Sequence, residues 1–242
     1  MKLFRFHKSF NSVVIGLVES GNFIPPEIAA AMTPQAVAYR SASHYLIALC
    51  ECSQLRDAGL VATNVSPLVV DLTRPLPENP SGTSVASLYH QTTPSGQAVY
   101  KDVQPTDHQL RRDTFYVPFF QKMNAELDRS VEKFGSATLV MMGCDANQTG
   151  RKICMTGEIA AEDVSDAIES AKTIGIEIET GETDERPLLD QRAASDAVKA
   201  GTLTLSSDCF LDDGAWSDKK ADQVREVLVK IVDGFSTNPT SL

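Results

Sequence analysis

Short runs of consecutive apolar residues alternate along this chain with longer segments of helical composition. Strands are predicted at Val13–Val18, Leu60–Thr63, Leu68–Leu72, Ala137–Gly143, Ile176–Thr180 and Thr202–Ser207. Helices are predicted at Pro34–Ala58, Thr106–Phe134 with a break at Pro118, Ala161–Ile174, Pro187–Ala200 and Trp216–Val232. This order is typical of a mixed, mostly parallel sheet flanked by helices. We therefore expect a single α/β domain over residues 1–235, followed by a polar tail at 236–242.

The charge balance narrows the partners that the chain can have. There are 22 Lys and Arg against 32 Asp and Glu, so the net charge is −10 at pH 7. A phosphate backbone would be repelled on average, and we expect no binding to nucleic acid. No apolar run approaches the ~20 residues of a membrane span, so no membrane association is expected.

Five cysteines in 242 residues do not form a disulfide framework, and their odd number favours a reducing compartment. We expect the cytoplasm, or an organelle if a presequence was removed. The stretch from Pro75 to Pro105 is rich in Pro, Ser, Thr and Gly and is long for a simple connection. It is interpreted either as a docking arm or as a loop folded back on the domain.

Polar residues follow three of the predicted strands, where open α/β sheets bind their ligands. These strand ends carry Glu19, Ser20 and Gly21; Cys144, Asp145 and Asn147; and Ser206, Ser207 and Asp208. The sequence therefore predicts a polar cleft at one edge of the sheet.

Few residues of the chain have the spacing of known catalytic motifs. The histidines, His7, His44, His90 and His108, fall in no zinc-binding pattern, and no glycine-rich nucleotide loop is present. Cys144 is the best candidate nucleophile, because it lies at a strand end, although a buried structural cysteine is the commoner case. Arg74 lies between a predicted strand and Pro75, where a guanidinium could bind a carboxylate in bidentate fashion.

Four stretches in order resemble one family. Glu19-Ser20-Gly21-Asn22 with Ile24-Pro25-Pro26-Glu27 is similar to the opening motif of the N-formylglutamate amidohydrolases, in which a histidine precedes Ser-Gly. Val69 to Pro75 resembles their Asp-x-Asn-Arg-Pro segment. The strand that leads to Asp145-Ala146-Asn147 resembles their strand ending in Asp-x-His-Ser, and Leu203 to Asp208 resembles their late Ile-Glu-Ile-Arg strand.

The resemblance implies a zinc-carboxypeptidase-like fold of the kind shared by phosphorylases and hydrolases. It also implies amide hydrolysis by zinc-activated water. In the family the opening histidine, an acidic residue on the first helix and the middle-strand histidine hold zinc, a late-strand glutamate is the general base, and arginines bind the substrate carboxylates. This chain departs from that set: Glu19 and Asn147 replace the histidines, no acid stands near Ser43 and His44, and Thr204 and Ser206 replace the late glutamate and arginine.

Two hypotheses follow. In the first, the chain is a non-catalytic relative, or pseudoenzyme, with no cofactor, which binds a small carboxylate ligand or a protein partner through Arg74, Ser20 and Asn147, or serves as a subunit. In the second, it hydrolyses a small amide or carboxylate substrate with a rebuilt site. Such a site would use Cys144, Glu19 and Asp145 as catalytic groups, or Glu19, Asp145 and Asp208 around a hard cation.

Overall fold

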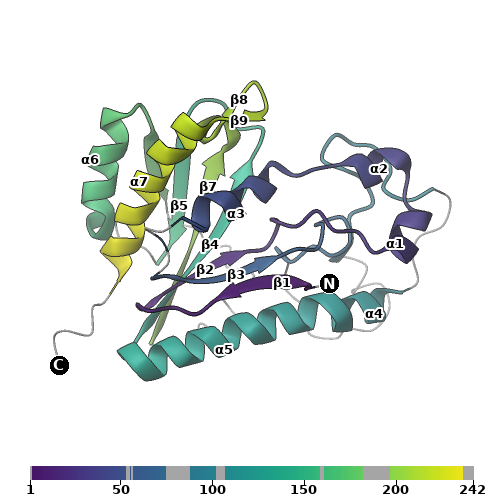
Figure 1. Cartoon of the computed structure of the whole chain (residues 1–242), viewed down its shortest axis with the longest axis horizontal. Coiled ribbons are helices and arrows are strands. Elements are labelled where there is room, and N and C mark those ends of the chain that lie inside the picture. Colours follow the sequence, from purple (N-terminus) through teal and green to yellow (C-terminus); the bar gives the residue numbers. More distant parts are fainter. Residues whose placement is uncertain are drawn as a thin grey trace.

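A seven-stranded mixed sheet forms the centre of the protein in the computed structural model (Figure 1). The structure describes residues 2–52, 55, 57–74, 88–101, 107–158, 161–181 and 197–236. The strand order is β1 (Phe4–His7), β3 (Gly59–Thr63), β2 (Val13–Leu17), β4 (Ala137–Asp145), β7 (Val198–Ser206), β5 (Lys152–Gly157) and β6 (Glu177–Gly181). The four middle strands are parallel, whereas β1 and β5 run antiparallel to β3 and β7. The predicted fold class, a mixed and mostly parallel α/β sheet, is confirmed.

Helices cover both faces of the sheet (Figure 1). The long helix α5 (Val117–Phe134) packs under β2, β3 and β4, and its apolar residues Phe119, Met123 and Leu127 are buried there. The opposite face is covered by α3 (Leu46–Cys50), α6 (Ser165–Thr173) and α7 (Asp218–Phe235). One buried cluster therefore lies on each side of the central strands.

Four of the five predicted helical segments contain helix, but two of them are more divided than the pattern indicated. Residues 108–134 form α4 (His108–Arg111), a π-helical turn (Arg112–Tyr116) and α5. The break precedes Pro118 because proline lacks an N–H and fits only the first turn of a helix. Residues 34–50 of the segment predicted at 34–58 contain α2 (Pro34–Ala38), a 3₁₀ turn (Ala42–Tyr45) and α3, and α1 (Pro26–Ala31) precedes them.

Two sequence predictions were wrong in type. Leu68–Leu72 is a buried turn rather than a strand, because its backbone bonds locally, as when Val69 N–H donates to the Ser66 carbonyl at 2.9 Å. Of the helix predicted at 187–200, residues 187–196 lie outside the described residues, and Val198–Ala200 begin β7 instead. There the helical composition was overridden by pairing with β4.

Several smaller elements were not predicted. They include β1, β5, a hairpin of β8 (Leu211–Asp212) and β9 (Ala215–Trp216), and a 3₁₀ turn at Ser207–Cys209. The helix predicted at Ala161–Ile174 begins with a 3₁₀ turn at Ala161–Val164. In the excursion from Pro75 to Pro105, residues 75–87 and 102–105 lie outside the described part. Of the remainder, Leu88, Val99 and Tyr100 are buried in the core, so residues 88–101 are folded back on the domain.

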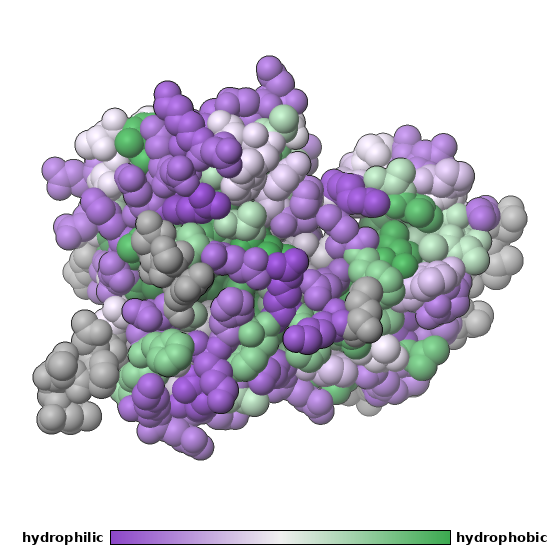
Figure 2. All heavy atoms as spheres, viewed as in Figure 1, coloured by the Kyte–Doolittle hydropathy of each residue, from purple (hydrophilic) through white to green (hydrophobic). Residues whose placement is uncertain are grey.

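Within the described part of the chain, no helix combines the length and the apolarity that crossing a membrane requires. All five cysteines are free thiols. Figure 2 shows a mostly hydrophilic face, with hydrophobic side chains gathered over the region of α1 and α2.

Candidate functional site

The carboxyl ends of β2, β3, β4 and β7 lie at the same edge of the sheet, because these four strands are parallel. The loop from Glu19 to Asn22 follows β2, and Asn64 follows β3. Cys144 and Asp145 end β4, and Ser206 ends β7 directly opposite Asp145. The predicted gathering of polar strand ends is therefore present, at the position where open α/β sheets bind ligands.

The Ser20-Gly21 pair fixes β2 against β3. The Ser20 hydroxyl is buried and lies 2.9 Å from the Thr63 carbonyl oxygen and 3.3 Å from that of Leu17. A Cβ on Gly21 would lie 2.1 Å from the carbonyl carbon of Asn64, so only glycine allows the two loops to approach this closely. The structure thus places Ser20, predicted to bind substrate, in contact with backbone carbonyls.

Glu19 lies beside a second carboxylate at this edge. Burial, and then the negative charge of Asp71, raises the pKa of Glu19 from 4.5 to about 7. Its Oε2 atom is 3.9 Å from where a Cβ on Gly143 would stand, which places the carboxyl against the end of β4. Burial also raises the pKa of Tyr39, and the charges of Glu19 and Cys144 add to that rise, so these groups are neighbours.

Asp71 is the anchor of the corner that carries Arg74. Its carboxylate is buried, accepts the Thr73 N–H at 2.9 Å, and pairs with Arg74 Nε at 2.9 Å and His90 Nε2 at 3.3 Å. The Tyr116 hydroxyl donates to the Arg74 carbonyl at 2.8 Å. The Arg74 side chain itself is 52% exposed, so a guanidinium fixed through Nε still has Nη donors for an anion.

The remaining residues that were predicted for the site do not join one cluster of contacts. Asp145 is exposed and accepts the backbone N–H of Asn147 at 2.8 Å, and Asn147 is exposed as well. Asp208 accepts the Gly150 N–H at 2.9 Å. Burial, followed by the neighbouring Cys209, Asp145 and Glu19, raises the pKa of the Cys144 thiol to about 12, so it is protonated at neutral pH.

No set of metal ligands forms among the residues that the structure describes. Three or more His, Cys, Asp or Glu side chains placed to hold an ion are not found in this part of the chain, and Glu19, Asp145 and Asp208 do not make such a set. Two of the histidines have other neighbours: His90 pairs with Asp71, and the His108 ring lies against the tilted ring of Tyr89, with centroids 4.7 Å apart. The carboxylate-metal alternative is therefore not formed in this structure.

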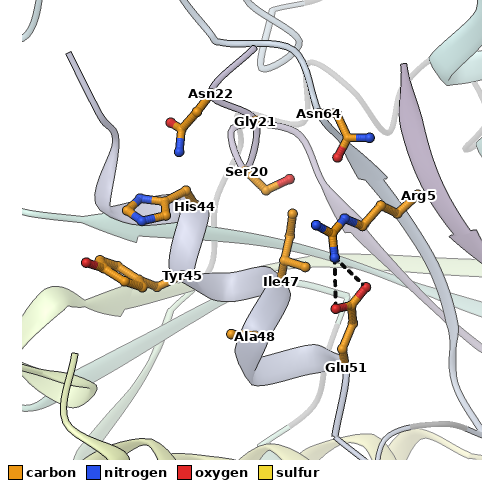
Figure 3. A pocket seen from close by; sticks show the side chains of 10 residues that line it. All are labelled: Arg5, Ser20, Gly21, Asn22, His44, Tyr45, Ile47, Ala48, Glu51 and Asn64. Carbon is orange, nitrogen blue, oxygen red and sulfur yellow. Dashed lines mark hydrogen bonds and ion pairs between the residues drawn. The ribbon is translucent and has the colours of Figure 1, made fainter. Parts of the chain in front are cut away.

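A pocket of about 370 Å³ lies beside this edge, between the loops after β2 and β3 and the helix α3 (Figure 3). Its lining includes Asn22, Asn64, His44 and the bidentate ion pair of Arg5 with Glu51, at 2.8 and 2.9 Å. Sequence reasoning missed these residues, as well as Tyr39 and the pairing of Asp71. Only Asp71 carried a signal, because it stands in the segment before Arg74.

The fold and this edge define an α/β-sheet protein whose candidate site lies at the carboxyl ends of parallel strands. The family model for N-formylglutamate amidohydrolase matches residues 12–149, and the chain belongs to this family. No curated protein matches the chain.

Two solved structures share the fold over nearly the whole length. An N-formylglutamate amidohydrolase from Ralstonia eutropha JMP134 is 14% identical, with a TM-score of 0.73 and coverage of 97% of this chain and 98% of that one. A gene product from Agrobacterium tumefaciens is 15% identical, with a TM-score of 0.67 and coverage of 97% and 95%. At this identity the similarity establishes the fold.

Proposed function

We propose that this member of the family is a non-catalytic binding protein for a small carboxylate ligand, with the zinc site of the family replaced. The observation that carries the proposal is Glu19, which stands where the family resemblance implies a zinc-binding histidine. It lies beside the buried carboxylate of Asp71, and its pKa is raised to about 7.

The side chains present do not fit the family's zinc. Zinc sites of hydrolytic enzymes use three protein ligands, most often histidines with one carboxylate. Here one position holds Glu19, another holds the neutral amide of Asn147, and the helical segment near Ser43 offers no acid. The side chains at these positions therefore do not support metal-assisted hydrolysis.

Arg74 is the functional residue of the family pattern that remains. Its guanidinium is held at a rigid corner by Asp71, and its side chain is half exposed. A fixed arginine loses little conformational entropy when it binds a carboxylate, which favours it as an anion-binding group. Asn147, exposed in the loop after β4, could supply an amide hydrogen bond to the same ligand.

The rebuilt hydrolase is the weaker alternative. A cysteine nucleophile requires the thiolate, and a thiol with a pKa of about 12 supplies almost none at pH 7. Asp145 and Asp208 each accept a hydrogen bond from a backbone N–H, of Asn147 and Gly150 respectively.

We also propose that residues 1–235 form the domain, that residues 236–242 are a polar tail, and that the protein is cytoplasmic.

Metal analysis and an activity assay on the full chain test the non-catalytic role. We expect protein purified without chelators to carry well under one zinc per chain, and N-formylglutamate to be hydrolysed no faster than in buffer, with or without added zinc. Stoichiometric zinc, or turnover that a chelator abolishes, would overturn the proposal.

Calorimetry with glutamate and N-formylglutamate tests the ligand class. Arg74→Ala should weaken carboxylate binding by about tenfold or more, because a charge-assisted bidentate contact contributes about 1.5–3 kcal/mol. Arg225→Ala, on the outer helix α7, is the matched control and should leave binding unchanged. Equal loss in both variants would remove the role assigned to Arg74.

A further inference from the structure

The outer edge of the sheet at β1 has backbone groups that face away from the sheet. In an antiparallel pair, alternate residues of a strand direct their N–H and C=O groups toward the partner strand. The Asn64 N–H donates to the Leu3 carbonyl at 2.9 Å, so Leu3 is one of the residues whose backbone faces β3. Leu3 and Arg5 therefore direct their backbone groups toward β3, whereas Phe4 and Phe6 direct theirs outward. Thr63, the partner of Phe4, follows the same alternation: its carbonyl faces β2, where it accepts a hydrogen bond from the Ser20 hydroxyl.

Two neighbouring recesses lie along this edge and share Arg5 and Glu51. A pocket of about 700 Å³ follows β1 and reaches the start of α5, and it is lined by residues 2–7, Glu51, Pro118 and Lys122. On the α3 side lies the pocket of about 370 Å³ that contains the Arg5–Glu51 pair (Figure 3). A strand added to this edge would run beside both recesses, so both would receive side chains from one extended segment.

We propose that the edge of β1 is a docking site for an extended acidic peptide segment of a partner protein, which adds to the sheet as an eighth strand. Outward-facing N–H and C=O groups at Phe4 and Phe6 would supply main-chain hydrogen bonds, and the two recesses would select the side chains. This inference does not depend on the ligand proposed for Arg74.

Charge complementarity identifies the chemistry of the partner. In a chain with net charge −10, this edge is locally basic, with Lys2, Arg5 and Lys122 around one acidic residue, Glu51. The Lys122 ammonium lies 3.4 Å from the centroid of the Phe6 ring, so positive charge stands directly beside the apolar recess. Figure 2 shows hydrophilic side chains over the part of the face that β1 crosses in Figure 1.

A second copy of the chain is a poorer occupant. Two β1 edges brought together would oppose basic residues to basic residues, which is how lysines on edge strands prevent self-association. An acidic segment meets no such repulsion, and the basic edge would also speed its encounter at low salt.

Fluorescence anisotropy with labelled peptides tests the proposal on the full chain. The probe is a peptide of about eight residues in which glutamate and valine alternate, long enough to span β1. One control peptide replaces glutamate with lysine, and another carries an N-methyl group on every amide, which removes the backbone donors from both edges of the peptide. We expect the acidic peptide to bind at least about tenfold more tightly than either control, and more weakly as salt rises.

Variants locate the site. Lys2→Glu with Lys122→Glu should weaken the acidic peptide by about tenfold or more, whereas Lys172→Glu on the distant helix α6 should not, and circular dichroism confirms that each variant is folded. Arg74→Ala should leave peptide affinity unchanged, which separates this site from the proposed ligand site.

Other results would overturn the proposal. These are no binding at millimolar protein, equal binding of the lysine or N-methylated peptide, or equal effects of the edge and control variants. Light scattering that shows a dimer dissociated by the edge variant would assign the edge to a second copy instead.

Discussion

Replacing Glu19 by glutamine should show how much the ionised form of this buried carboxyl, beside Asp71, lowers the free energy of unfolding. In the folded protein, burial and Asp71 raise the pKa of Glu19 from 4.5 to about 7. Between these two values the folded state holds a proton that the unfolded state has released. The stability contributed by the protonated carboxyl is therefore present below pH 4.5 and is lost as the pH rises to about 7.

The magnitude follows from the size of this change in pKa. A rise from 4.5 to about 7 corresponds to about 3 kcal/mol at pH 8. Water that reaches the partly exposed carboxylate lowers the figure, so we expect Glu19→Gln to gain about 1–3 kcal/mol over the wild type at pH 8. At pH 4.5 the two proteins should be nearly equal, because a neutral acid and an amide differ little in solvation.

Urea denaturation followed by circular dichroism between pH 4.5 and 8.5 measures this difference directly. In a domain of this size the gain corresponds to a few to about 10 °C in Tm. Glu27→Gln, on the exposed side of α1, is the matched control and should show no pH-dependent gain. A Glu19→Gln gain that is constant with pH, or absent at pH 8, would refute the reasoning.

Two further substitutions and one labelling experiment test other parts of the structure. Arg111→Met should cost about 3–5 kcal/mol in urea denaturation, since the buried guanidinium bonds a tyrosine hydroxyl at 2.7 Å and an aspartate at 2.9 Å that would lose its partner. Gly21→Ala should lower the free energy of unfolding by about 2 kcal/mol or more, because its Cβ would overlap backbone, whereas Gly181→Ala meets only ordinary contacts and should cost under about 1 kcal/mol. At pH 8, iodoacetamide should alkylate Cys144, with its pKa of about 12, far more slowly than Cys52, as measured by peptide mass spectrometry; equal rates would contradict the raised pKa of this half-buried thiol.

The sequence predicted those elements whose pattern is set by burial on the core. Val13–Val18 and Ala137–Gly143 are almost entirely apolar because they become the central strands β2 and β4, which have helices on both faces. In α5, the apolar residues Phe119, Met123 and Leu127 are buried against the sheet. Strand β1 was missed because it is short and lies at an edge, where only alternate residues face the core.

Part of the candidate site could be located from the sequence, but its contacts could not. The polar strand ends and Arg74 were named from their positions along the chain, and the parallel sheet does bring the strand ends to one edge. Arg74 and Asp71 are only three residues apart in the sequence, so their pairing could have been predicted from the sequence. The contact of Asp71 with His90 joins segments that no local pattern connects.

The sequence by itself determined the α/β class, the break near Pro118 and the presence of Glu19 and Asn147 in segments that resemble the motifs of the family. These features depend on local composition and on spacing along a strand or helix, which folding does not change. Only the tertiary structure decided the raised pKa of Glu19, that of the half-buried Cys144 thiol and the position of β1 at the edge of the sheet. Desolvation and charge proximity act between residues distant in the chain, so they exist only once the strands and helices have packed together.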